Sequence, residues 1–73
     1  MSELTYLQHI GNNIKELRKF RKWTQQQLAD AAGIRMATIS DIEAGKANCE
    51  IATLVRIASA LNCYLDITFT PVK

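Results

Sequence analysis

The chain lacks the side chains on which most catalytic and metal sites depend. It has a single histidine, His9, and its two cysteines, Cys49 and Cys63, stand far apart without the spacing of metal ligands. Its carboxylates are scattered, so no acid–base pair or activated nucleophile is visible. The sequence therefore argues against an enzyme and gives no reason to expect a cofactor or a metal. The two cysteines are typical of reduced thiols in a cytosolic protein rather than of a disulfide.

Long apolar runs and a strong net charge are also missing. No run approaches the roughly 18 apolar residues that a transmembrane helix needs. The N-terminus has no basic region followed by an apolar core, as a secretory signal would have. We therefore expect a cytoplasmic protein without a membrane partner. The net charge of +2 is only weakly basic, so it permits nucleic-acid binding without arguing for it, and the distribution of the charges matters more.

What the chain does contain is typical of a small folded domain. Hydrophobic residues make up 48% and charged residues 22% of its 73 residues, which indicates a folded chain and not a disordered one. A chain of this length forms one domain with a thin core, and oligomerisation often stabilises such domains. We expect a single domain over residues 1–73, with its core in residues 7–62.

Two short helices joined by a tight turn are predicted between Thr24 and Gly45. Thr24 caps the first helix, over 25–32, because its hydroxyl can accept from a free backbone N–H of the first turn. Gly33 ends that helix, since a glycine takes the left-handed conformation easily. The second helix spans about 35–44, and Gly45 ends it in the same way.

Small and apolar residues stand at fixed intervals in this stretch: Ala29, Gly33, Ile39 and Ile42. Ala29 is small enough to let the two helices cross closely, and the two isoleucines face inward at helical spacing. This is the pattern of a helix-turn-helix, in which two helices cross steeply over a short turn.

One further helix is predicted on each side of this motif. The first spans about 7–22. Its inward positions are Leu7, Ile10, Ile14, Leu17 and Phe20. Gly11 within it costs about 1 kcal/mol relative to alanine, which indicates either close packing or an irregular first turn. The second spans about 50–61, and its wide apolar face indicates a core on one side and a partner on the other. The fold class is therefore all-α, a compact domain of four helices.

These residues resemble the helix-turn-helix of the phage-repressor and Cro family, also called the XRE family. The resemblance rests on WTQQQLADAAGI (23–34) and TISDIEAGK (38–46), is extended by ATLVRIASALN (52–62), and covers roughly residues 10–62. It implies a domain that binds duplex DNA sequence-specifically. The second helix of the motif would be the recognition helix, which enters the major groove.

The outward face of this recognition helix supplies the predicted base-reading residues. They are Arg35, Met36, Ala37, Ser40 and Asp41. Arg35 would either make a bidentate contact to a guanine or bind a phosphate. Met36 and Ala37 suit the methyl groups of thymine, whereas Asp41 would accept from a cytosine amino group or lie at the edge of the groove.

Contacts to DNA phosphates are expected from a second set of residues. They are Thr24, Gln25, Thr38, Lys46 and Asn48. The start of a helix offers free N–H groups and the positive end of the helix dipole, both of which suit a phosphate. The resemblance implies that Gln25, at the start of the first motif helix, and Lys46, after the second, contact phosphates. Asn48 would join them or cap the last helix.

The resemblance also implies an ion pair between Arg18 and Glu43. In the family an arginine at this place pairs with the matching glutamate, and both residues are present here. We expect the pair to be partly buried, so that removing one partner leaves the other charge unsatisfied. The alternative is two unpaired surface charges.

The last segment departs from the commoner family pattern, which continues into a fifth helix. Apolar and polar residues alternate over 63–70 and Pro71 closes the run, as in a β-strand. A lone strand is unstable, so we expect it to pair antiparallel with the same strand of a second copy through Leu65, Ile67 and Phe69. This tail is similar to that of the HipB-like antitoxins. The alternative is an irregular tail packed on its own domain.

The sequence therefore predicts a dimeric, repressor-type protein that binds a palindromic operator in double-stranded DNA. The resemblance implies regulation by autorepression, or a role as an antitoxin that holds a kinase-like, HipA-like toxin. The alternative is a protein-interaction module that kept the fold without binding DNA. That alternative is supported by the weak net charge, by Asp41, and by the absence of polar base-reading side chains at Met36 and Ala37.

Overall fold

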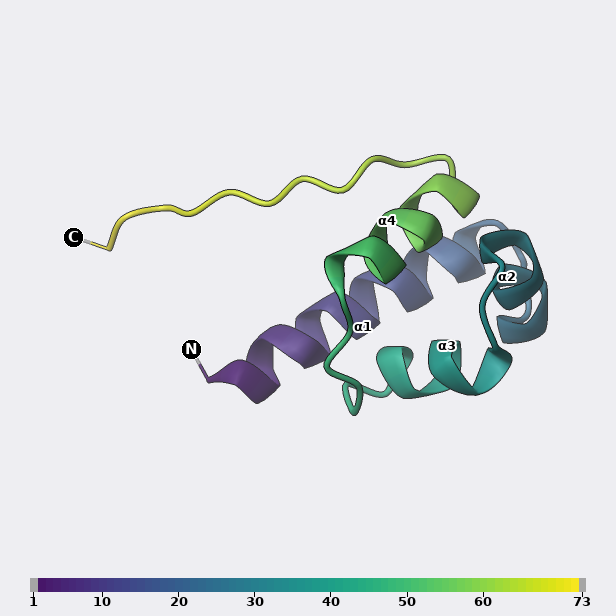
Figure 1. The fold of residues 1–73 in the computed structure, drawn as a ribbon, viewed down its shortest axis with the longest axis horizontal. Helices are drawn as coiled ribbons and strands as arrows, with labels where there is room; N and C mark the ends of the chain where they lie inside the picture. Colours follow the sequence, from purple (N-terminus) through teal and green to yellow (C-terminus); the bar gives the residue numbers. More distant parts are fainter. Residues whose placement is uncertain (1, 73) are drawn as a thin grey trace.

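The computed structural model describes residues 2–72, in which four helices are followed by an extended tail (Figure 1). The helices are α1 (Glu3–Phe20), α2 (Gln25–Ala32), α3 (Met36–Glu43) and α4 (Ile51–Ala60). This result confirms the predicted all-α arrangement. Within residues 2–72, every helix is too short or too polar to span a membrane.

Helix α1 is shifted toward the N-terminus relative to the prediction of 7–22. It begins at Glu3 because the Ser2 hydroxyl accepts from the Thr5 N–H at 3.2 Å and so caps the helix. It ends at Phe20, since Lys22 turns into the left-handed region with a φ of 59°. A lysine rarely takes that conformation, so the sequence carries no signal for this end of the helix.

Helix α2 has the predicted bounds and the predicted caps. The Thr24 hydroxyl accepts from the Gln27 N–H at 3.1 Å, and the Gln27 side chain accepts from the Thr24 N–H at 2.8 Å. At the other end Gly33 has a φ of 70°, which lets the chain turn sharply toward α3. The turn of the motif is therefore held by hydrogen bonds at its start and by a glycine at its end.

Helices α3 and α4 are each one residue shorter at both ends than predicted. Arg35 and Glu50 are their N-cap residues, and neither side chain caps its helix. Asn48 therefore does not cap α4, which was one of the two roles open to it. Gly45 follows α3 with a φ of 73°, as expected of a glycine that ends a helix.

An apolar core lies between the helices. Its most deeply buried large side chains are Leu28, Ile39, Ile42 and Ile57, and around them lie Ile14, Ala29, Ala32, Leu54 and Leu61. The motif thus buries the side chains that its spacing predicts. Contrary to the prediction, Phe20 faces outward and is 87% exposed. It stands two residues after the buried Arg18, which is about 200° around the helix.

Helices α1 and α3 approach each other most closely at Gly11. A Cβ placed there would collide with the backbone oxygen of Ile42 and would lie 2.9 Å from that of Glu43. Since α1 is helical through this position, the glycine reflects close packing and not an irregular turn. Only a residue without a side chain lets α1 lie against the last turn of α3 in this way.

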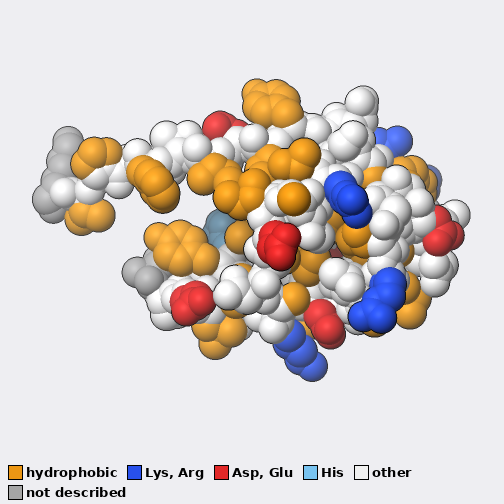
Figure 2. Space-filling view, in the orientation of Figure 1, with side chains coloured by type: hydrophobic (Ala, Val, Ile, Leu, Met, Phe, Trp, Pro, Cys, Tyr) orange, Lys and Arg blue, Asp and Glu red, His pale blue; other side chains and the backbone are white. Residues whose placement is uncertain are grey.

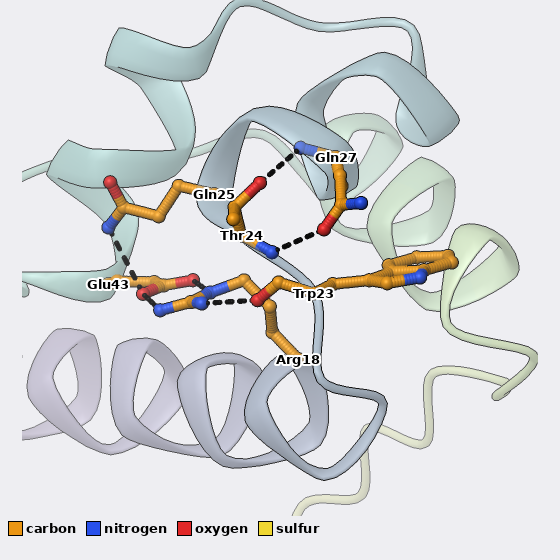
Figure 3. Close-up of polar contacts among 6 residues, drawn as sticks. All are labelled: Arg18, Trp23, Thr24, Gln25, Gln27 and Glu43. Atoms are coloured by element: carbon orange, nitrogen blue, oxygen red, sulfur yellow. Dashed lines mark hydrogen bonds and ion pairs between the residues drawn. The ribbon is translucent and has the colours of Figure 1, made fainter.

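A buried ion pair ties α1 to α3 (Figure 3). Arg18 Nε donates to Glu43 Oε2 at 2.7 Å, and Arg18 Nη2 donates to Glu43 Oε1 at 2.9 Å. The two side chains are only 11% and 3% exposed, so the pair lies in the interior. Arg18 Nη1 also donates to the Trp23 carbonyl at 2.7 Å. The hydrogen bonds to Glu43 raise the pKa of Arg18 above its ordinary value.

The tail, residues 63–72, forms no β-strand in the described chain. It is extended and runs from the end of α4 back toward the side of the N-terminus (Figure 1). The predicted strand over 63–70 is absent from the single chain because a strand exists only through hydrogen bonds to another strand. The apolar side chains of the tail stay in solvent (Figure 2), Phe69 being 97% and Ile67 56% exposed. Pairing with a second copy stays a prediction.

We expect Gly11→Ala to destabilise the protein even though alanine favours a helix. The added methyl group would meet backbone atoms of α3, which cannot move aside as a flexible side chain could. We therefore expect an overpacking cost at or above the upper end of the usual range of about 1–3 kcal/mol. After the roughly 1 kcal/mol gained in helix propensity, the free energy of unfolding should fall by about 2 kcal/mol in a urea titration. Asn12→Ala, exposed on the same helix, is the control. Equal or greater stability of Gly11→Ala would contradict the close packing.

We expect Glu43→Ala to lower the free energy of unfolding by about 3–5 kcal/mol, because Arg18 would remain buried without a counter-charge. Replacing both residues by apolar ones, as in Arg18→Met with Glu43→Leu, should recover much of this loss. Chemical denaturation measures both effects, and Glu16→Ala, at an exposed position of α1, should change stability by less than about 0.5 kcal/mol. A loss below about 1 kcal/mol for Glu43→Ala, the range of exposed pairs, would contradict burial.

Candidate nucleic-acid interface

The outward face of α3 presents the side chains predicted to read bases. Arg35, Met36, Ala37 and Asp41 are exposed, and Ser40 is half-buried. Ile39 and Ile42 of the same helix lie in the core, and this determines which face points outward. Met36 keeps 43% of its surface exposed, so its side chain is accessible for an apolar contact.

Arg35 stands immediately before the first turn of α3. Within residues 2–72 no side chain accepts from the first N–H groups of this helix, and residues 35–37 at its start are exposed to solvent. The Arg35 side chain is exposed and takes part in no ion pair within residues 2–72. Its guanidinium is therefore free to contact a base or a phosphate, and both contacts stay open.

The start of α2 lies beside the end of α3 and is joined to it by Gln25. This side chain is half-buried, and its Nε2 donates to Glu43 Oε1 at 3.2 Å (Figure 3). The predicted phosphate contact is thus already bonded to the buried ion pair. The backbone N–H groups of Gln25 and Gln26 find no acceptor within residues 2–72, as is usual in the first turn of a helix.

Two further predicted phosphate contacts, Thr24 and Thr38, lie on the motif helices. Thr24 is exposed, and its hydroxyl, which accepts from the Gln27 N–H, still has its own hydrogen to donate. Thr38 is half-buried in the first turn of α3. Of the two, Thr24 is the more accessible to a ligand.

Lys46 and Asn48 lie on the loop between α3 and α4, and both are exposed. The backbone of Lys46 has a defined position, because its N–H donates to the Asp41 carbonyl at 2.9 Å. Gly45 packs against α1, where a Cβ would lie 2.9 Å from Gln8 Cγ. The loop is therefore held in place while the Lys46 ammonium group remains in solvent.

Sequence reasoning misses several contacts that hold this region together. The bond from the Thr24 N–H to the Gln27 side chain has a readable signal, a glutamine three residues after the capping threonine. The bond from Arg18 to the Trp23 carbonyl has none, because any residue supplies a carbonyl. The Arg21 guanidinium also lies 4.5 Å from the centre of the Trp23 ring, which is a cation–π contact. This contact depends on the path that the chain takes as it leaves α1, so the sequence does not predict it.

Comparison with known proteins places this geometry in a family. The HTH_3 helix-turn-helix family matches residues 14–67. The competence pilus inhibition repressor of Acinetobacter baylyi is 40% identical over 60 residues, which make up 82% of this chain and 54% of that protein. This chain therefore corresponds to about half of that repressor.

Solved structures share the fold. An HTH_3 family transcriptional regulator from Vibrio cholerae has a TM-score of 0.81 at 34% identity, over 85% of this chain and 35% of that one. A chain of the HipA–HipB–O2–O3 complex has a TM-score of 0.75 at 31% identity, over 89% of this chain and 92% of that one. The family match includes α2, α3 and the turn between them. This protein belongs to the HTH_3 helix-turn-helix family.

Proposed function

We propose that this protein binds double-stranded DNA sequence-specifically and regulates transcription as a repressor. The proposal is carried by the outward face of α3, where Arg35, Met36 and Ala37 are exposed while the opposite face is packed in the core. A helix presented in this way fits the major groove, with its first residues against the base edges. The family supports the proposal, since relatives are a repressor and a transcriptional regulator. Such a protein would act in the cytoplasm.

Affinity and specificity would come from different parts of the motif. The first turn of α2 with Thr24 and Gln25, and the loop with Lys46 and Asn48, would contact phosphates and set the register on the duplex. Lys46 would add a charge that releases a counterion from the DNA on binding. The half-buried Thr38 would contribute a weaker contact of the same kind.

Specificity would come from an unusual reading face. Met36 and Ala37 would make apolar contacts with thymine methyl groups, and Arg35 would contact a guanine or a neighbouring phosphate. Asp41 repels phosphates, so it would face a cytosine amino group, with Ser40 beside it as a hydroxyl donor. A single acid on the face penalises wrong sequences as well as favouring the right one.

The DNA-binding unit would be a dimer joined through the tails. The tail exposes Leu65, Ile67 and Phe69, and α4 adds Ile51 and Val55, which are 60% and 50% exposed. Two tails running antiparallel across a two-fold axis would pair their backbone groups and cover apolar side chains. The two α3 helices would then face successive major grooves, roughly 34 Å apart, on a palindromic operator.

A toxin is a further proposed partner. The fold match extends over 92% of a chain in the HipA–HipB–O2–O3 complex, which is a more complete match than that to the longer regulators. On this basis a toxin like HipA would be held by the dimer, and the dimer would repress its own gene.

Lys46→Met should weaken DNA binding and lower its dependence on salt. Removing one phosphate contact should reduce the slope of log affinity against log salt by about 0.9 per site. The measurement is a titration of DNA from upstream of the protein's own gene, and of scrambled DNA, at two salt concentrations. Arg56→Met is the matched control, because it removes the same charge from an exposed position of α4, which lies across the molecule from α3 (Figure 1). No binding of either DNA by the unmodified protein would favour a protein-interaction module instead.

Ile67→Asp should convert the dimer into a monomer in sedimentation experiments at micromolar concentration, because a buried charge would face the partner tail. Thr68→Asp is the control: its side chain points to the opposite face of an extended tail, so the dimer should persist. A stable monomer of the unmodified protein at the same concentration would contradict pairing through the tails.

A further inference from the structure

The buried ion pair reaches the proposed DNA-binding surface through one hydrogen bond (Figure 3). Glu43 Oε1 accepts from Arg18 Nη2 at 2.9 Å and from Gln25 Nε2 at 3.2 Å. Gln25 is the first residue of α2. Its side chain therefore runs from the open end of the helix to a carboxylate in the interior (Figure 3).

This bond decides which end of the Gln25 amide faces inward. An ionised carboxylate only accepts hydrogen bonds, so the amide nitrogen must point to Glu43 and the amide oxygen must point away. An amide nitrogen carries two hydrogens, and Glu43 engages one of them. The second N–H finds no acceptor within residues 2–72, and the backbone N–H groups of Gln25 and Gln26 are unpaired there as well.

The charges in this arrangement do not oppose an anion. Arg18 donates to both carboxylate oxygens of Glu43, so the pair is close to neutral when seen from the start of α2. The nearby N–H groups and the positive end of the helix dipole then favour a phosphate. Glu43 thus orients a donor at this position without adding net negative charge to it.

We propose that Glu43 is a positioning residue for DNA binding, which acts by holding the Gln25 amide so that its second N–H donates to a backbone phosphate. This inference rests on the proposed DNA-binding function and assigns Glu43 a role beyond stability. A glutamine without this bond would lose rotamer freedom on binding and would present its oxygen as readily as its nitrogen. With the bond, the donor is already in place before the DNA arrives.

The test compares Gln25→Met, which keeps the length of the side chain but removes its donors, with Gln26→Met. Gln26 lies in the same turn and donates to Asp30 at 2.8 Å instead. The probe is a random-sequence duplex at low salt, because phosphate contacts do not depend on the operator. Gln25→Met should weaken binding about tenfold, the value of one hydrogen bond to a charged group, with no change in salt slope, since glutamine is neutral. Gln26→Met should bind like the unmodified protein.

The role of Glu43 is isolated by repeating Gln25→Met in a Glu43→Gln background. If Glu43 positions the amide, Glu43→Gln alone should weaken binding by the folded protein, and adding Gln25→Met should cost little more. The same tenfold loss in both backgrounds would overturn the inference, as would unchanged binding by Gln25→Met. A parallel Lys46→Met titration keeps the two proposals apart. If Lys46→Met lowers the salt slope and Gln25→Met has no effect, DNA binding stands and the positioning role falls.

A second measurement uses the unmodified protein in case Glu43→Gln does not fold. The two side-chain amide protons of Gln25 should lie further apart in chemical shift in an NMR spectrum than those of the exposed Gln8, because one of them is bonded to the Glu43 carboxylate. Addition of the random duplex should shift the other proton. A separation no larger than that of Gln8, or no response to DNA, would overturn the inference.

Discussion

The buried pair of Arg18 and Glu43 is the interaction on which the rest of the structure depends. It joins α1 to the last turn of α3, and the third nitrogen of the Arg18 guanidinium, Nη1, donates to the Trp23 carbonyl between α1 and α2. A buried pair of this kind adds little net stability over apolar residues of the same volume. Its contribution is to orientation: three hydrogen bonds to a planar guanidinium fix how α1 and α3 lie relative to each other.

Close packing of backbone against backbone completes that placement. Gly11 lets α1 lie on the carbonyls at the end of α3, and Gly45 lets the following loop lie on α1 near Gln8. With both contacts and the ion pair in place, the outward face of α3 and the loop that carries Lys46 are presented by a rigid support. Such a support favours binding, because little free energy is then spent on ordering side chains and loops when a ligand binds.

The apolar surface of the protein is unevenly covered. The motif side is closed around Leu28, Ile39 and Ile42, whereas the tail and one face of α4 leave large apolar side chains in solvent. A chain this small has little core to spare, so an uncovered face of this extent fits a subunit better than a free monomer. We propose that the second copy which covers it also sets the spacing of the two reading helices, so that dimerisation and operator recognition depend on the same segment.

The sequence by itself determined the helices of the motif, their caps at Thr24 and Gly33, and the burial of Ile39 and Ile42, because these features follow from local hydrogen bonding and from a period of 3.6 residues. It also supplied the family and, through it, the pairing of Arg18 with Glu43. Only the tertiary structure decided why Gly11 is a glycine, where α1 ends, and that Gln25 is bonded to Glu43. The Gly11 and Gln25 contacts depend on atoms brought together from distant parts of the chain. The end of α1 depends on Lys22, which takes a left-handed conformation that local rules do not predict for lysine. Neither decides the tail: its alternating pattern is local, but a strand needs hydrogen bonds to a second strand, and residues 2–72 contain no strand.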